Sequence, residues 1–287
     1  MKRSLCFHAL QVAAAILVLS SLAIGQENDH RGDRYLALGD SVSFSFITQA
    51  GYEYVNPKNF HGFPNDVSHK NDLRLSNPSC PGETSGSFLS ATAPDNGCRA
   101  FRAVAPLHVA YASTQLDYAT SFLLAHRDTR LVTIILGAND LFLLQNHCLN
   151  DPTCIAAGLP QVLGQVAINM ATILGDLRTT GYRGKIVVLN YYSTDYTNPS
   201  TTGAVAALNQ VLKAAATQGG ALVADLFGAF ETASLPAGGH TCSAGLLNAL
   251  PQNQYLCDVH PSQSGHLLIA RTIDRTLNNA PDEDDDR

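Results

Sequence analysis

The amino-acid sequence predicts an α/β fold, a three-layer α/β/α sandwich around a mostly parallel sheet. Four short runs rich in Val, Ile and Leu show no alternation of apolar and polar residues, which is typical of strands buried on both faces. Segments with apolar residues at helical spacing lie between and after these runs. Because strands that alternate with helices form parallel sheets covered on both faces, the order of the segments predicts the sandwich.

The runs and segments that support this prediction are short and well separated. The expected strands are residues 35–38, 131–136, 185–189 and 221–226. The expected helices are residues 114–125, 162–177, 205–217 and 264–277. Two long stretches, 46–75 and 76–112, show neither pattern. Stretches of this length usually carry function, and functional groups in such sheets lie beyond the carboxyl ends of the strands. We therefore expect both stretches to wall a substrate site there.

The two ends of the chain differ from its middle. Lys2 and Arg3 precede an almost wholly apolar stretch, 9–23, and small residues then indicate cleavage near Gln26. We interpret residues 1–25 as a signal peptide. A membrane anchor is the alternative, but the stretch is shorter than the ~20 residues that a spanning helix needs. Residues 280–287 form an acidic tail that we expect to be disordered. We interpret residues 33–279 as one domain. We expect the protein to be secreted or periplasmic, with no stable membrane span after cleavage.

Six cysteines follow the expected signal peptide. An even number in an exported chain indicates disulfides, and their grouping in local pairs favours short loops, which are the easiest to close. The expected disulfides are Cys80–Cys98, Cys148–Cys154 and Cys242–Cys257. A zinc site is disfavoured because the chain contains no Cys-x-x-Cys. The net charge of −6 gives no sign of a nucleic-acid partner, whose phosphates attract a basic face.

Residues suited to acyl transfer follow two of the expected strands. Gly39-Asp40-Ser41 follows the first, where the glycine permits a tight turn and Ser41 begins a helix whose free N–H groups can stabilise an oxyanion. Asn139 follows the second and can donate its side-chain amide. For both Ser41 and Asn139, the alternative role is that of a helix cap. His260 precedes the last expected helix and can act as the general base for Ser41, although most histidines are surface or core residues. The chain lacks the Gly-x-Ser-x-Gly turn of the large α/β-hydrolase superfamily.

Taken together, these segments resemble the SGNH family, also called GDSL-type esterases and lipases. Ser41 in Gly-Asp-Ser, Gly82 in Cys-Pro-Gly-Glu-Thr, Asn139 and His260 occur in the family's order, within residues 34–275. The Gly82 segment and the local cysteine pairs resemble its exported bacterial lipase-like branch. The resemblance implies a flavodoxin-like sandwich with Ser41 as the nucleophile and His260 as the base. It also implies an oxyanion hole from the backbone N–H groups of Ser41 and Gly82 and the side chain of Asn139.

The segment around His260 departs from the family's Asp-x-x-His. The residue three before His260 is Cys257, and the acid, Asp258, is only two before it. Three interpretations stay open. Asp258 orients His260 as the third member of a triad, a backbone carbonyl near Cys257 does so instead, or Asp258 caps the last helix. Asp225, after the fourth expected strand, is the other candidate acid, and we expect it to be structural.

The resemblance implies hydrolysis of carboxylic esters through an acyl-enzyme on Ser41, with no cofactor. The expected partner is a small-molecule or lipid ester, and the expected state is a monomer. A carbohydrate O-deacetylase, an acyltransferase and a catalytically silent secreted binding module are alternatives on the same fold. Tyr191, Tyr192 and Tyr196 either line the pocket or pack in a loop. His266 is expected to be structural.

Overall fold

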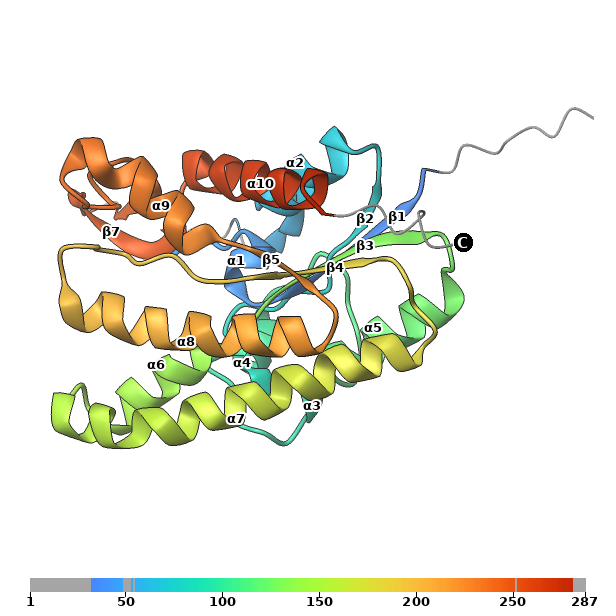
Figure 1. The fold of residues 1–287 in the computed structure, drawn as a ribbon, viewed down its shortest axis with the longest axis horizontal. Helices are drawn as coiled ribbons and strands as arrows, with labels where there is room; N and C mark the ends of the chain where they lie inside the picture. The colour runs from blue at the N-terminus through green and yellow to red at the C-terminus, as the bar shows by residue number, and fades with distance from the viewer. Residues whose placement is uncertain (1–31, 49–52, 54, 251, 281–287) are drawn as a thin grey trace, which may run out of the picture. The chain divides into compact units, whose positions relative to one another are not determined.

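Five parallel strands form the central sheet of the protein (Figure 1). The structure is a computed structural model and describes residues 32–48, 53, 55–250 and 252–280. The expected signal peptide and residues 281–287 of the expected tail lie outside these described residues. In sheet order the strands are β2 (Arg74–Ser76), β1 (Arg34–Gly39), β3 (Thr129–Ile135), β4 (Lys185–Leu189) and β5 (Leu222–Ala224).

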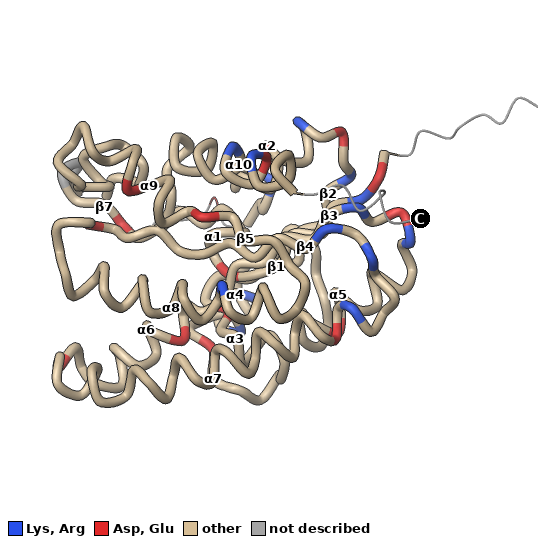
Figure 2. The backbone as a smooth tube through the Cα atoms, in the orientation of Figure 1, with Lys and Arg blue, Asp and Glu red and all other residues tan. Residues whose placement is uncertain are grey.

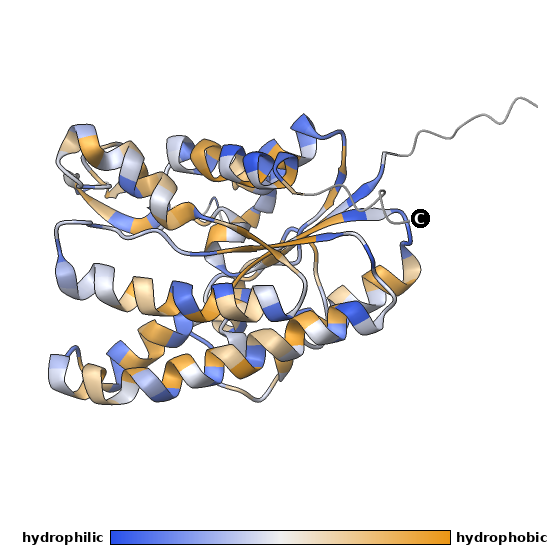
Figure 3. Ribbon diagram, in the orientation of Figure 1, coloured by the Kyte–Doolittle hydropathy of each residue, from blue (hydrophilic) through white to orange (hydrophobic). Residues whose placement is uncertain are grey.

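Helices cover both faces of this sheet, which confirms the predicted three-layer sandwich (Figure 1). One layer contains α2 (Phe63–Lys70), α9 (Leu226–Ser234) and α10 (Gln263–Asn278). The other contains α5 (Gln115–Ala125), α7 (Pro152–Thr179) and α8 (Pro199–Gln218). The apolar strands lie between the two layers (Figure 3), and side chains such as Leu36, Val132 and Val187 are fully buried. Burial on both faces explains why these strands lack alternation.

The stretches from residue 46 to 112 contain more regular structure than the sequence predicts. They include the 3₁₀ helix η2 (Pro57–Asn59), α2, β2, α3 (Ser85–Leu89) and α4 (Cys98–Val104). These elements are too short to show a clear hydrophobic period. Local caps help to form them. The Thr84 side chain, for example, accepts a hydrogen bond from the backbone N–H of Ser87 at the start of α3.

Several short elements lie near the carboxyl ends of the strands. The helix expected to begin at Ser41 is present as α1 (Ser41–Phe44), and α6 (Ala138–His147) follows β3. Sequence analysis missed η3 (Leu235–Ala237) and an antiparallel hairpin of β6 (Leu247–Leu250) and β7 (Asn253–Pro261). The last predicted helix begins after this hairpin, so His260 lies on a strand and not at a helix start.

Among the described helices, α7 is the one long and apolar enough to cross a membrane by length and composition. Its second half packs into the protein core through Val166, Met170, Ile173 and Leu174. The Asn169 side chain also donates a hydrogen bond to Ser85 Oγ at 2.9 Å. This half of α7 is therefore part of the helical layer of the sandwich.

All three expected disulfides are present. They are Cys80–Cys98, Cys148–Cys154 and Cys242–Cys257. Lys and Arg residues gather toward the end of the sheet where the strands begin, and they are sparse at the end with α6 and β7 (Figure 2). The segments 131–177, 186–212 and 214–270 contain no Lys or Arg. The end of the molecule beyond the carboxyl edge is therefore poor in positive charge.

Candidate active site

The turn after β1 places Ser41 at the start of α1. Gly39 has φ +130°, and a Cβ at this position would lie 2.2 Å from the Ile135 carbonyl oxygen, so a side chain does not fit. Gln115 holds the same glycine, because its Oε1 accepts from Gly39 N at 2.6 Å and its Nε2 donates to Gly39 O at 3.0 Å. Asp40 caps α1 by accepting from Val42 N at 2.9 Å. Ser41 therefore follows the cap, and its hydroxyl is not needed there.

The structure brings His260 to Ser41. His260 Nε2 lies 2.9 Å from Ser41 Oγ, which is hydrogen-bonding distance. The two residues are far apart in the sequence and come from β7 and α1. The Phe46 ring meets the His260 ring edge-on, with centroids 5.0 Å apart. The Tyr192 hydroxyl donates to the Val259 carbonyl at 2.7 Å and so holds the strand beside His260.

Two oxygen atoms lie beside the other ring nitrogen of His260. Nδ1 is 3.4 Å from Asp258 Oδ1 and 3.3 Å from Thr48 Oγ1. Asp258 is itself held, because its Oδ1 accepts from His260 N at 2.5 Å and its Oδ2 accepts from Thr48 N at 3.3 Å. Burial opposes ionisation of Asp258, but hydrogen bonds from His260 and Thr48 outweigh it and lower the pKa of the carboxyl.

The strand explains how an acid two residues before His260 can reach its ring. Residues i and i+2 of a strand point to the same face, and Asp258 and His260 both lie on β7. The interpretation of Asp258 as the cap of the last helix is wrong. Ser262 caps α10, and its Oγ accepts from Gly265 N at 3.2 Å. Sequence analysis missed Thr48, which lies in an irregular stretch without a motif.

Asn139 lies in the first turn of α6 and is buried. Its Nδ2 donates to the Glu83 carbonyl at 3.0 Å, and its Oδ1 accepts from Asn96 Nδ2 at 2.9 Å. The Glu83 carbonyl can only accept, so this contact fixes which end of the amide is the donor. The N-cap of α6 is Gly137, so the alternative in which Asn139 caps the helix is wrong.

Gly82 lies in the loop that reaches Asn139. It has φ +83°, and a Cβ would lie 2.4 Å from the Asn96 carbonyl oxygen. The Gly82 carbonyl accepts from Asn96 N at 2.8 Å, and the Cys80–Cys98 disulfide closes the loop. Gly82 is thus one residue from a direct contact of Asn139. It is not among the described residues that line the cavity at Ser41.

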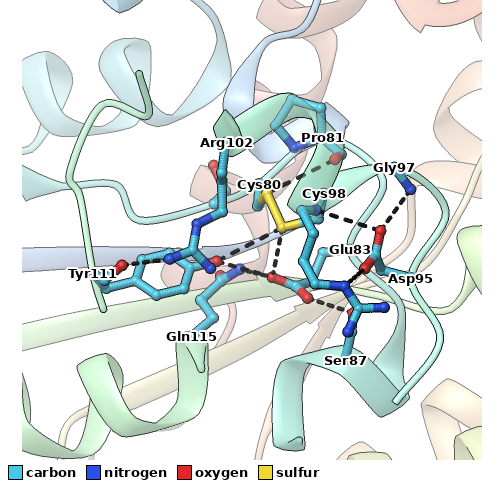
Figure 4. The surroundings of a disulfide bond; sticks show 12 residues. Cys80, Pro81, Glu83, Ser87, Asp95, Gly97, Cys98, Arg102, Tyr111 and Gln115 are labelled. Carbon is cyan, nitrogen blue, oxygen red and sulfur yellow. Dashed lines mark hydrogen bonds and ion pairs between the residues drawn. A yellow bond between two sulfur atoms is a disulfide. The ribbon is translucent and has the colours of Figure 1, made fainter. Parts of the chain in front are cut away.

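A buried carboxyl, Glu83, connects this loop to Gln115 (Figure 4). The Glu83 side chain accepts hydrogen bonds from Ser87 Oγ, from Gln115 Nε2 at 3.1 Å and from the Tyr111 hydroxyl at 3.1 Å. Burial raises the pKa of Glu83. Because Gln115 also binds Gly39, the network couples the two segments that carry Ser41 and Gly82. Sequence analysis missed Glu83 and Gln115, since their partners are distant in the chain.

This network does not form a metal site. Glu83 lies beside the sulfur atoms of Cys80 and Cys98, a combination of ligand types that can hold a metal ion. The two sulfurs are joined to each other, however, and metal binding by cysteine requires free thiolates. The cluster is therefore part of the loop's scaffold.

A second buried carboxyl, Asp40, lies directly before Ser41. Burial raises the pKa of Asp40 to about 6, although the Tyr191 hydroxyl and the Val42 N–H both donate to it. Tyr191 and Tyr192 line the cavity at Ser41. Tyr196 is not among its described lining residues, and its hydroxyl donates to the Phe227 carbonyl at 2.7 Å.

The remaining candidates have structural contacts. Asp225 caps α9, and its Oδ1 accepts from Asn190 Nδ2 at 2.8 Å and from Gly228 N at 3.2 Å. His266 is buried, its Nδ1 accepts from Phe63 N at 3.3 Å, and burial lowers its pKa to about 3. Neither residue is among the described residues that line the cavity. These contacts agree with the structural roles expected for both.

Ser41, Asn139 and His260 border one cavity with a volume of about 500 Å³. Its walls come mostly from α6, α7 and α8 and from the segment after β4. The sheet order β2-β1-β3-β4-β5 places β1 beside β3, where the chain changes direction across the sheet. In open α/β sheets ligands bind outside the carboxyl ends of the strands at such a point.

The fold and the contact of Ser41 with His260 are compatible with the class of α/β/α hydrolases that lack the Gly-x-Ser-x-Gly turn. The sequence model of the GDSL-like Lipase/Acylhydrolase family matches residues 37–268. The chain therefore belongs to this family, and membership supports hydrolysis of esters.

Comparison with solved structures gives the same fold at low sequence identity. The acetylxylan esterase Axe2 from Geobacillus stearothermophilus is 16% identical, with a TM-score of 0.52 over 87% of this chain and 95% of that chain. Phospholipase A1 from Streptomyces albidoflavus NA297 is 18% identical, with a TM-score of 0.57 over 85% of this chain and 99% of that chain. A search of curated proteins gave no match.

Proposed function

We propose that this protein hydrolyses carboxylic esters through an acyl-enzyme on Ser41, with His260 as the general base. The observation that carries the proposal is the 2.9 Å separation of His260 Nε2 and Ser41 Oγ at the edge of the cavity. A base must lie within hydrogen-bonding reach of the proton that it removes, and this pair meets that condition.

The reaction proceeds in two halves. His260 takes the Ser41 proton as Oγ attacks the ester carbonyl carbon, and the carbonyl oxygen becomes an oxyanion. Collapse of this intermediate breaks the bond to the alcohol oxygen, which receives the proton from His260 and leaves. His260 then deprotonates a water molecule that attacks the acyl carbon, and the acid departs as Ser41 recovers its proton.

The oxyanion needs donors that are already in place, because preorganised hydrogen bonds stabilise the transition state most. The proposed donors are the backbone N–H groups of Ser41 and Gly82 and the side-chain amide of Asn139. The contact from Asn139 Nδ2 to the Glu83 carbonyl supports this assignment, since it orients the NH₂ group and leaves a second N–H on the same nitrogen.

Asp258 is proposed as the acid that orients His260, with Thr48 as a second support. The carboxylate is ionised readily and lies beside Nδ1, where it can stabilise the imidazolium that forms during the reaction. The three disulfides fit an oxidising compartment, so we also propose a secreted or periplasmic location.

Hydrolysis of a chromogenic ester by the Ser41→Ala variant tests the nucleophile. We expect activity to fall to background, while Ser43→Ala serves as the matched control in the same helix. Ser43 is buried, and its hydroxyl has no hydrogen-bond partner in the described structure, so its removal should change turnover little. Full activity in Ser41→Ala would refute the proposal, as would an inactive wild-type protein on every ester.

The role of Asp258 is tested by Asp258→Asn and Thr48→Val. Loss of a true orienting acid can reduce kcat by ~10⁴, and we expect a loss approaching this size in Asp258→Asn. Thr48→Val should reduce kcat by about tenfold or less, which corresponds to the loss of one neutral hydrogen bond. If Asp258→Asn keeps activity within about tenfold of wild type, a Ser–His pair without an acid replaces the triad.

A further inference from the structure

We infer that the cavity beside Ser41 binds the acyl part of the ester, and that it selects straight, uncharged acyl chains of medium to long length over acetyl. This inference rests on the proposed function, because it assigns a ligand to the same site. It separates two kinds of ester hydrolysis, removal of acetyl groups and cleavage of fatty acyl esters, which the fold alone does not distinguish.

The position of the cavity favours the acyl group over the alcohol. Ser41 and Asn139 both border it, so the carbonyl carbon and its oxyanion would lie against its wall beside these two residues. The alcohol leaves after the first half of the reaction, whereas the acyl group stays bonded to Ser41 until water attacks. A cavity that continues from Ser41 is therefore filled for longest by the acyl chain.

The chemistry of the wall favours an aliphatic chain. Leu141, Phe142, Ile155, Leu159 and Val205 are among its apolar lining residues, contributed by α6, α7 and α8. Burial of each methylene against such a wall increases affinity by up to about fourfold. Cavities that are mostly apolar with few polar groups are typical of sites for apolar ligands.

The charge of the wall disfavours an acyl group with a second carboxylate or a phosphate. Among the described lining residues none is Lys or Arg, and the ionisable ones of other kinds are Asp40, His260 and the two tyrosines. Asp40 already accepts hydrogen bonds from Tyr191 and Val42. An anionic acyl chain would lose its hydration here without gaining a cation.

The size of the cavity disfavours an acetyl group as the acyl part of the ester. A water molecule occupies about 30 Å³ in the liquid, and taking a methylene as similar, an eight-carbon chain fills about 240 Å³. The cavity holds about 500 Å³, so an acetyl group would leave most of it without a ligand. An apolar space of this size gains little from a two-carbon group, because the gain is proportional to the apolar area removed from water.

A disulfide also cross-links part of the cavity wall. Cys148 ends α6 and Cys154 lies in the first turn of α7, so their disulfide ties together the two helices that form one side of the wall. These ends of α6 and α7 lie beyond the edge of the sheet on the side of β7 (Figure 1). A cross-linked wall has less conformational freedom to lose when it binds the chain.

The test measures kcat/KM for p-nitrophenyl acetate, butyrate, octanoate and dodecanoate below their aggregation limits, and in parallel for acetates of butanol and octanol. We expect octanoate to exceed acetate by at least about fiftyfold, with little change along the alcohol series. A wild-type protein that prefers acetate, with activity lost in Ser41→Ala, overturns the inference and leaves the proposed function intact. A rise along the alcohol series alone overturns it in favour of an alcohol site.

Adjacent residues of α7 provide a matched pair of variants. Ala156 and Ala157 are both exposed, but only Ala156 is among the described lining residues. Ala156→Phe should lower the octanoate-to-acetate ratio by about tenfold or more, and Ala157→Phe should leave that ratio unchanged. Ala204→Phe, from the α8 side of the cavity, should act like Ala156→Phe. Equal ratios in all three variants and the wild type would overturn the inference.

Discussion

The buried carboxyl of Asp40 should make the stability of this protein fall as the pH rises, and Asp40→Asn should remove that dependence. The side chain is almost fully buried and accepts from Val42 N and the Tyr191 hydroxyl. Asparagine keeps a capping oxygen for α1, and the tyrosine hydroxyl can accept from its amide. The substitution should therefore preserve the fold while it removes the ionisable group.

The magnitude follows from the shift in the pKa of Asp40, from an ordinary 3.8 to about 6. Because the folded state binds this proton more tightly than the unfolded state, stability falls as the pH rises between the two values. A shift of this size corresponds to about 3 kcal/mol in total. About 2 kcal/mol of it is lost between pH 4.5 and pH 8, because part of the change precedes pH 4.5.

Urea denaturation at pH 4.5 and pH 8, with the disulfides intact, measures the effect. The stability of Asp40→Asn relative to wild type should increase by about 2 kcal/mol from the lower to the higher pH. Glu231→Gln, which changes an exposed carboxylate on α9, controls for a general effect of net charge. Parallel pH profiles for wild type and Asp40→Asn would show that the buried carboxyl is not held protonated in the folded state.

Three other changes probe separate parts of the site. Asn139→Ala should reduce kcat for a chromogenic ester by ~10²–10³, and an unchanged kcat would remove this residue from the oxyanion hole. Gly39→Ala should lower the free energy of unfolding by about 1–3 kcal/mol in urea titrations, because of its φ of +130° and the contact of a Cβ with a backbone oxygen. Replacing Cys242 and Cys257 together by serine should lower the free energy of unfolding by about 2–5 kcal/mol. On heating, this variant should lose its activity before it loses the helical circular dichroism signal. Simultaneous loss of both signals would contradict a local role for this disulfide.

The parts of the fold that sequence analysis predicted are those with a strong local signal. Strands β1, β3 and β4 are continuous apolar runs, and the larger helices carry a clear period. β2 has only three residues and β6 only four, so neither shows a pattern that differs from a loop. Both form because a neighbouring strand pairs with them, which a local pattern does not report.

In the candidate site, too, the residues with a local sequence signal were predicted and those without one were not. Ser41, Asn139 and His260 belong to short motifs and could be identified from the residues around them. Thr48 and Glu83 act through contacts with residues that are far apart in the chain. The spacing of Asp258 and His260 became clear only when both were found on a strand, where a separation of two places side chains on one face.

None of the three disulfides joins two strands of the five-stranded sheet. The bond between Cys148 and Cys154 instead joins the ends of α6 and α7, two helices that contribute to the cavity wall. Mutations and short insertions in the segment that this bond encloses can therefore alter the wall without disturbing strand pairing. For laboratory evolution this marks segment 149–153 as a place to diversify, while the sheet and the loop around Gly82 are kept constant.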